Sequence, residues 1–180
     1  MAEFVRIERG LGPEGRIAVV RFDRADGINA LSPEALRELT AAARAFEDDA
    51  TTSVVVLTGN AKAFSAGFDF KDPAGRSRRT MALGSLRRHL KLGPRLTGAW
   101  HDMEQVTIAA IEGFCIGGGV ALAVALDFRV MARDAHMRVP EIGLGMNMSW
   151  QSVPRMLHLI GPARTKQAVI LAEAERDEMA

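Results

Sequence analysis

The sequence contains a single cysteine, Cys115, among 180 residues. One thiol excludes a disulfide framework and a zinc site built from cysteine alone. The four histidines are not spaced as a metal-binding pair. Nothing in the sequence therefore indicates a metal, a nucleotide cofactor or a flavin, and the scarcity of cysteine favours a reducing, intracellular compartment.

An excess of charge of one sign is also missing, because 23 basic residues nearly cancel 22 acidic ones and leave a formal net charge of +1. This balance gives no bulk attraction to nucleic acid or to a membrane surface, so an anionic ligand must be met locally. No stretch approaches the ~18–20 apolar residues of a membrane span, and the first residues lack a targeting pattern. We expect a cytoplasmic protein without membrane contact, for which nucleic acid is a disfavoured partner.

What is present is a hydrophobic content of 48%, sufficient for an ordinary core, and no linker or repeat divides the chain. Strand and helix patterns alternate after an N-terminal hairpin, and Ser32 with Pro33 starts the first helix, which predicts one α/β domain over residues 1–180 with a parallel sheet. The expected strands are 4–8, 17–22, 53–58, 107–111, 128–132 and 137–139. The expected helices are 33–47, 77–91, 95–103, 120–126, 154–159 and 162–175.

Two glycine-rich segments each follow a predicted strand directly. They are residues 62–70 (KAFSAGFDF) and residues 113–119 (GFCIGGG). Glycine lets the backbone approach a ligand closely, and a helix start directs free N–H groups at it, so two such junctions facing each other would form an oxyanion hole. The simpler alternative is that these glycines only allow tight turns and close packing.

Two other ligand-site motifs are absent. Ser65 lacks the Gly-x-Ser-x-Gly context of a hydrolase nucleophile. The run 117–119 lacks the spacing and the later acidic residue of a dinucleotide-binding fingerprint.

Five segments, in order, resemble motifs of the crotonase (enoyl-CoA hydratase/isomerase) superfamily. The resemblance implies the ClpP/crotonase fold, a spiral of ββα turns, and a substrate that carries coenzyme A. Homologues continue with further helices and form trimers or hexamers, so we expect a C-terminal helical region to be missing from this chain and a homotrimer or hexamer as its assembly. The segments are 23–31 (DRADGINAL), 62–70, 113–119, 127–132 (DFRVMA) and 139–145 (VPEIGLG).

The resemblance also implies roles for individual residues. The N–H groups of Phe68 and Gly118 would receive the thioester oxygen, and Glu141 would be the catalytic acid or base. Asp69 would be a structural hydrogen-bonding residue of its loop. The residues expected to contact the coenzyme A ester are Arg24, Ala25, Ile28, Lys62, Ala63, Ala66, Gly67, Phe68, Asp69, Phe70, Gly117, Gly118, Pro140 and Leu144.

Glu141 follows Pro140, a position that is on its own also typical of a solvated turn. Apolar neighbours such as Val139 would raise the pKa of a catalytic carboxyl here. Hydratases of the family usually carry a second glutamate two residues after the triple glycine, but this chain has Ala121. We therefore favour an isomerase over a hydratase, with hydration or another lyase reaction as the alternative.

Two further stretches each allow two interpretations, and the first of them departs from the family pattern. Residues 146–151 (MNMSWQ) replace a glycine-rich segment, and Met148 and Trp150 would either form an acyl-binding cavity or belong to the core. Seven basic residues between Pro73 and His101 indicate either a solvated face or a contact with coenzyme A phosphates. The same basic stretch would be the contact surface if the chain were a non-catalytic RNA- or protein-binding relative. These basic residues are Arg76, Arg78, Arg79, Arg87, Arg88, Lys91 and Arg95.

Overall fold

The computed structural model describes residues 4–73, 77–172 and 174–176, and for 78–79 and 174–176 it describes the backbone alone. Its centre is a five-stranded sheet with the strand order β1-β2-β3-β5-β7. The predicted N-terminal hairpin is confirmed, since β1 and β2 pair antiparallel around a short 3-10 helix, and the remaining neighbours pair parallel, as the apolar strand patterns indicate. The strands are β1 (Val5–Leu11), β2 (Ile17–Phe22), β3 (Val54–Thr58), β5 (Val106–Ile111) and β7 (Phe128–Met131), with η1 (Pro13–Gly15) in the hairpin.

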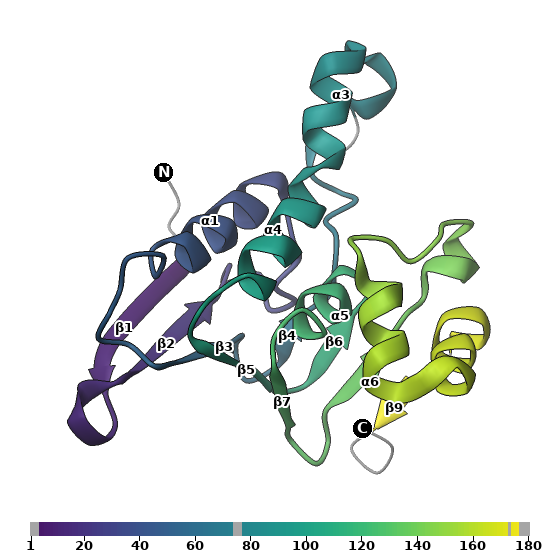
Figure 1. The fold of residues 1–180 in the computed structure, drawn as a ribbon. Helices are drawn as coiled ribbons and strands as arrows, with labels where there is room; N and C mark the ends of the chain where they lie inside the picture. The colour runs from purple at the N-terminus through teal and green to yellow at the C-terminus, as the bar shows by residue number, and fades with distance from the viewer. Residues whose placement is uncertain (1–3, 74–76, 173, 177–180) are drawn as a thin grey trace.

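A second sheet of four strands has the order β4-β6-β8-β9. Each strand of the first sheet from β3 onward is followed along the chain by one strand of the second sheet, and helical segments then lead to the next pair (Figure 1). This arrangement confirms the expected spiral of ββα turns. The second-sheet strands are β4 (Ala63–Ser65), β6 (Phe114–Ile116), β8 (His136–Arg138) and β9 (Ala174–Arg176).

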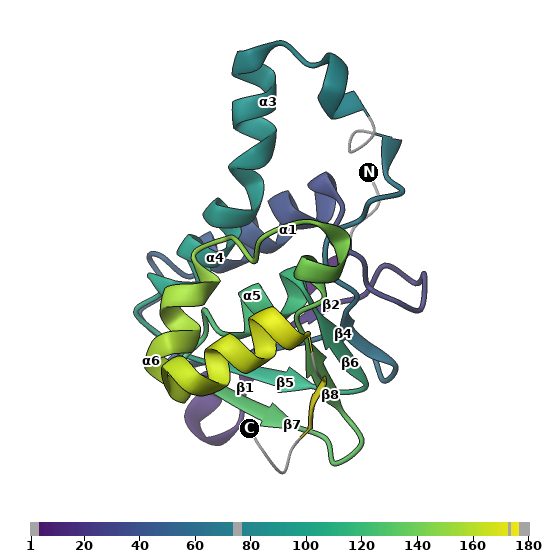
Figure 2. The same cartoon turned by 90° about the vertical axis from the view of Figure 1, so that its right-hand side faces the viewer.

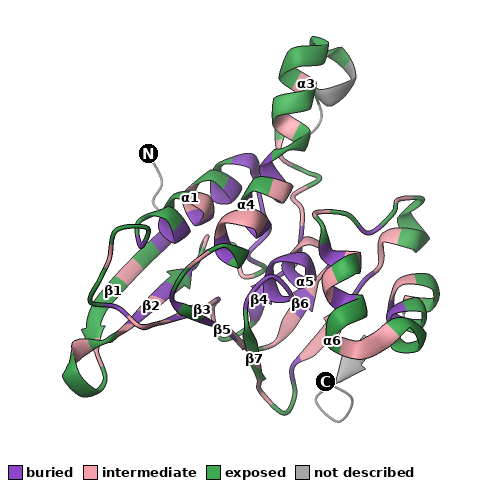
Figure 3. Cartoon of the chain, in the orientation of Figure 1, coloured by how far each residue is buried: buried purple, intermediate pink, exposed green. Residues whose placement is uncertain are grey.

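The helices cover the sheets unequally. Helices α1 and α4 lie side by side over the five-stranded sheet, where the indole N–H of Trp100 donates to the Leu39 carbonyl at 3.1 Å. Helix α5 is buried all round, as its apolar sequence predicts, whereas α3 projects from the body and is largely exposed (Figures 2 and 3). The helices are α1 (Pro33–Arg44), α3 (Leu83–Leu90), α4 (Leu92–His101), α5 (Gly118–Ala123) and α6 (Ser152–Lys166). Shorter helical turns are η2 (Ser77–Thr80), η3 (Glu141–Leu144) and the π-helical η4 (Gln167–Leu171).

Three expectations from the sequence need correction. The strands β4 and β6 lie in segments predicted as glycine-rich loops, because each has only three residues and is stabilised by pairing with the other. The helices predicted over 77–91 and 95–103 are not separated by residues 92–94, because α4 begins directly after Lys91. Pro94 lies in the first turn of α4, where its missing N–H is tolerated. The last helix does not run to residue 175, because residues 174–176 pair with β8.

Helix α1 shows how local sequence sets these boundaries. The hydroxyl of Ser32 accepts from the Ala35 N–H at 3.2 Å, and Pro33 occupies the first helical position, as predicted.

Within the described residues, no helix is long and apolar enough to cross a membrane.

One buried side chain joins the end of β2 to β4. The amide of Asn29 donates to the carbonyls of Phe22 at 2.8 Å and Ala63 at 3.1 Å, and its oxygen accepts from the Arg24 N–H at 3.0 Å. Asn29 is fully buried and has a φ of 48°, a left-handed conformation that asparagine tolerates better than most residues. The Asn29 amide group therefore helps to fix the loop of residues 23–31 against the second sheet, together with backbone hydrogen bonds between this loop and residues 66–69.

Replacing Asn29 with alanine should destabilise the protein by about 2–3 kcal/mol, because two buried carbonyls and one N–H lose their partner. Urea unfolding followed by circular dichroism measures this loss. Asn147→Ala is the matched control, since Asn147 is exposed and makes one long hydrogen bond of 3.5 Å. Equal stability of the two variants would contradict the role given to Asn29.

Candidate active site

A cavity of about 550 Å³ lies where the two glycine-rich junctions meet. Its outer wall is formed by exposed side chains such as Phe70 and Leu144, and its inner end by the buried Ala121 and Met148. The lining comprises Ala66, Gly67, Phe68, Phe70, His89, Leu90, Gly93, Pro94, Ile116, Gly117, Gly118, Ala121, Pro140, Glu141, Leu144, Met146, Asn147, Met148, Ser149 and Trp150.

The first junction follows β4 and is held in place by Leu31. The N–H of Leu31 donates to the Gly67 carbonyl at 2.7 Å, and its carbonyl accepts from the Asp69 N–H at 3.1 Å. Because successive N–H groups of an extended chain alternate in direction, the N–H of Phe68 points away from Leu31. Phe68 thus lies on the cavity wall with its backbone orientation set by its two neighbours.

The second junction links β6 to α5 and lies directly against the first. Gly117 precedes the helix with a φ of 52°, and its N–H donates to the Arg138 carbonyl at 2.8 Å. Gly118 is the first helical residue, where an N–H has no acceptor within its own helix. A Cβ built on Gly67 would lie 2.6 Å from the Ile116 carbonyl oxygen and 3.0 Å from the Gly118 nitrogen. The structure therefore brings the backbone of Gly67, the residue before Phe68, against that of Gly118.

Glu141 begins η3, and its carboxylate enters the cavity beside the second junction. A Cβ on Gly117 would lie 2.7 Å from Oε1 of Glu141, so the carboxylate occupies the space that this glycine leaves. Its Oε2 atom is buried and has no hydrogen-bond partner within the described residues. Burial raises the pKa of the Glu141 carboxyl above its ordinary value of 4.5, in the direction that the sequence predicts. A half-buried carboxyl group with one buried oxygen that lacks a partner within the described residues is typical of a catalytic acid or base.

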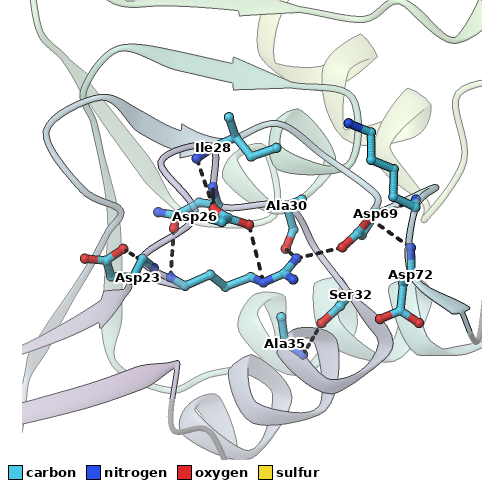
Figure 4. A network of polar contacts seen from close by, with 12 residues as sticks. Asp23, Asp26, Ile28, Ala30, Ser32, Ala35, Asp69 and Asp72 are labelled. Carbon is cyan, nitrogen blue, oxygen red and sulfur yellow. Dashed lines mark hydrogen bonds and ion pairs between the residues drawn. The ribbon is translucent and has the colours of Figure 1, made fainter.

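Arg24 and Asp69 stabilise the loop of residues 23–31, called the outer loop below, and do not line the cavity. The Arg24 guanidinium donates to Asp69 at 2.8 Å and to the Ala30 carbonyl at 2.7 Å, and it pairs with Asp26 at 3.5 Å (Figure 4). The other oxygen of Asp69 accepts from the N–H groups at positions 71 and 72. Partial burial raises the pKa of Asp69, but the hydrogen bonds from Arg24 and the backbone outweigh it and hold that pKa below its ordinary value. Asp69 thus has the structural position that the sequence indicates.

The fourteen residues expected to contact coenzyme A divide into two groups. Eight line the cavity: Ala66, Gly67, Phe68, Phe70, Gly117, Gly118, Pro140 and Leu144. Six do not: Arg24, Ala25, Ile28, Lys62, Ala63 and Asp69. Of the second group, Ala63 is fully buried, whereas Ile28 is 45% exposed on the outer loop. Among the basic stretch, Arg76 and the side chains of Arg78 and Arg79 lie outside the described residues.

Part of the cavity wall was not predicted from the sequence. His89 and Leu90 of α3 and Gly93 and Pro94 of α4 line it, although no motif marks them. Of the segment 146–151, the buried Met148 and the half-buried Trp150 both line the cavity and pack against the core, so membership of the core does not exclude a place in the cavity wall. The described residues contain no group of three His, Cys, Asp or Glu side chains that could hold a metal ion.

The model of a protein family described as "Enoyl-CoA hydratase/isomerase" matches residues 12–179. The chain is 32% identical to the crotonyl-CoA hydratase of Syntrophomonas wolfei over 164 residues, which covers 91% of the chain and 61% of that protein. It is 31% identical to the short-chain-enoyl-CoA hydratase of Clostridium acetobutylicum, with the same coverage of both proteins. The chain thus spans about three fifths of the length of these curated relatives.

Solved structures give the same result for the fold. The crystal structure of an enoyl-CoA hydratase from Bacillus anthracis superimposes with a TM-score of 0.86 at 28% identity, covering 97% of this chain and 65% of the other. An enoyl-CoA hydratase/carnithine racemase from Magnetospirillum magneticum has a TM-score of 0.86 at 26% identity, covering 99% and 64%.

The position of Glu141 predicts a change in stability with pH. Because its pKa is raised in the folded state, ionisation above that pKa is easier in the unfolded chain and lowers the free energy of unfolding. Glu141→Gln should therefore stabilise the protein by about 1 kcal/mol at neutral pH, a midpoint shift of about 2–4 °C. The difference should vanish below pH 4.5, where the carboxyl is protonated in both states. Thermal unfolding at several pH values tests this, with exposed Glu8→Gln as the control; a destabilised Glu141→Gln variant at neutral pH would contradict it.

Proposed function

The chain belongs to the enoyl-CoA hydratase/isomerase family, and we propose that its cavity stabilises the enolate of an enoyl-CoA thioester while Glu141 transfers a proton. The observation that carries this proposal is the Glu141 carboxylate, whose buried Oε2 atom has no partner within the described residues, beside the paired backbone junctions. Neither feature alone distinguishes a reactive site from tight packing, but together they supply a place for negative charge and a group that moves a proton.

The thioester oxygen is received between the N–H groups of Phe68 and Gly118. When a proton leaves the carbon next to the thioester, negative charge moves onto this oxygen, and each preorganised donor is typically worth ~3–4 kcal/mol there. The close contact of Gly67 with Gly118 supports this role, because it fixes both backbones before the substrate arrives. Little reorganisation is then needed during the reaction.

We propose isomerisation as the reaction, because Glu141 is the one carboxylate among the described residues that line the cavity. A carboxylate alone can take a proton from C2 of a 3-enoyl thioester, leaving a dienolate. The carboxylic acid then returns the proton to C4, so that the double bond moves from C3–C4 to C2–C3 and no atom is gained or lost. Burial raises the pKa of the Glu141 carboxyl toward the working pH, and this assists both proton transfers.

Hydration is the second candidate, supported by the names of the relatives, which describe crotonyl-CoA and short-chain-enoyl-CoA hydratases. A hydratase grips the added water between two carboxylates in the family pattern, and the position of the second is held here by Ala121, which is buried at the inner end of the cavity. Hydration by this chain would need another group to orient the water.

The outer loop is proposed to receive the coenzyme A portion. Exposed Ile28 and Phe70 offer apolar surface on this side of the molecule. The guanidinium of Arg24 is occupied by Asp69 and Ala30, so its contribution is to shape the loop and not to bind a phosphate. Lys62 is exposed beside this loop and is the better candidate for a phosphate contact.

A paired assay with 3-enoyl-CoA and 2-enoyl-CoA substrates tests the reaction. We expect the double bond of the 3-enoyl ester to move without a change of mass. Glu141→Gln should lower kcat by about a hundredfold to ten-thousandfold, since the amide cannot exchange the proton. Absorbance and mass spectrometry follow both products, and Glu8→Gln is the control.

Three other results would change the assignment. A gain of one water molecule with the 2-enoyl ester would assign a hydratase. No reaction with either ester would contradict the enzymatic proposal and favour a binding protein. Full activity in Glu141→Gln would remove Glu141 from the chemistry.

Replacing Ala121 with glutamate tests why the second carboxylate matters. If the absence of a second carboxylate suppresses hydration, Ala121→Glu should raise the rate of 2-enoyl-CoA hydration by at least about tenfold relative to the rate of isomerisation, because two carboxylates can then hold the water. Ala121→Gln has a side chain of the same size and is the matched control. An equal gain in both variants would show that shape, and not proton transfer, limits hydration.

A further inference from the structure

Trp150 lies between two helices at a place where each carries a glycine. A Cβ on Gly93 of α4 would lie 2.0 Å from Cε2 of the indole, and a Cβ on Gly118 of α5 would lie 2.8 Å from its Cη2. These distances are far shorter than van der Waals contact, so neither helix could carry a side chain here while the indole stays in place. Gly93 and Gly118 thus form a slot that the indole fills.

The backbone of this segment is held in an unfavourable conformation. Trp150 has a φ of 56° and Gln151 a φ of 60°, a left-handed pair without glycine that costs roughly 1–2 kcal/mol per residue. The Trp150 carbonyl accepts from the hydroxyl of buried Thr97 at 2.9 Å and from Arg155 at 3.4 Å. Strained residues that several neighbours hold in place are typical of ligand-binding sites.

The indole also borders the position of the reacting atoms. Its six-membered ring lies over Gly118, a proposed donor to the thioester oxygen, while the Glu141 carboxylate lies over the preceding Gly117. A thioester held at Gly118 would therefore have its neighbouring carbons beside both the carboxylate and the indole. Ala121, one turn further along α5, and Met148 line the buried inner end of the cavity.

We propose that Trp150 determines the acyl-chain specificity of the site, by closing its inner end so that it accepts short-chain acyl-CoA esters and rejects long ones. This inference rests on the proposed function, since it takes the cavity to be an acyl site. An acyl chain that leaves the donors toward the inner end meets the indole in the slot between α4 and α5. Further methylenes would meet the indole there, and the hydrogen bonds to the Trp150 carbonyl oppose its displacement.

Calorimetric titration with saturated acyl-CoA esters tests the inference without requiring turnover. The wild type should bind butanoyl- and hexanoyl-CoA more tightly than octanoyl- and decanoyl-CoA. Trp150→Ala opens the slot, and the affinity ratio of decanoyl- to butanoyl-CoA should rise by at least about tenfold, because each buried methylene is worth roughly a factor of four. Trp150→Phe should lie between the two.

The slot offers a second test within the same experiment. In a Trp150→Ala background, Gly93→Leu places a new side chain from α4 into the vacated space and should restore the preference for short chains. Leu159→Ala, an exposed change on α6, is the control and should leave the ratio unchanged. Circular dichroism confirms that each variant is folded.

The possible outcomes separate this inference from the proposed function. An unchanged ratio in Trp150→Ala, a wild type that prefers decanoyl-CoA, or no binding of any ester would each overturn the role of Trp150. Acyl-CoA binding with the expected ratios, but without reaction of either enoyl ester, would overturn the proposed chemistry alone.

Discussion

The close contact between the backbones of the two glycine-rich junctions is the constraint on which the site depends. Gly67 approaches Ile116 and Gly118 so closely that even a methyl group would collide with backbone atoms, which cannot rotate away as a side chain can. Each junction follows a short strand of the second sheet, and β4 and β6 are themselves paired. The positions of the two proposed donors are therefore set by the spiral, in which successive turns place equivalent strand ends beside one another.

The rest of the loop structure keeps this contact rigid. Asn29 joins the 23–31 loop to β4, and Arg24 joins it to the segment after β4 through Asp69. Hydrogen bonds and ion pairs are thus concentrated around the first junction. Beside the second junction, the Glu141 carboxylate has one oxygen with no hydrogen bond within the described residues. Polar interactions therefore stabilise the backbone of the proposed donors, whereas the carboxylate proposed to exchange a proton is left without such stabilisation at one oxygen.

Much of this arrangement follows from the sequence, but not all of it. The apolar runs of β3 and β5 and the capped start of α1 are local signals, and they predicted these elements correctly. The strands β4, β6 and β9 have no such signal, because they have three residues each and form only when partners distant in the sequence meet. The motif resemblance led to Glu141, Phe68 and Gly118. It gave no indication of His89 or Gly93, since both positions are decided by tertiary packing: Gly93 packs against Trp150, and the His89 ring lies beside that of Phe68.

Helix α3 contributes no buried residue, yet His89 and Leu90 near its end form part of the cavity wall. Along the chain it lies between β4 and β5, and it projects away from both sheets, so its side chains contribute little to the core of the spiral (Figures 1 and 2). Selection for a new ligand can therefore alter or exchange this segment while the backbone donors and the core stay as they are. The fold separates the part that must be inherited unchanged from a part that is free to diverge between lineages.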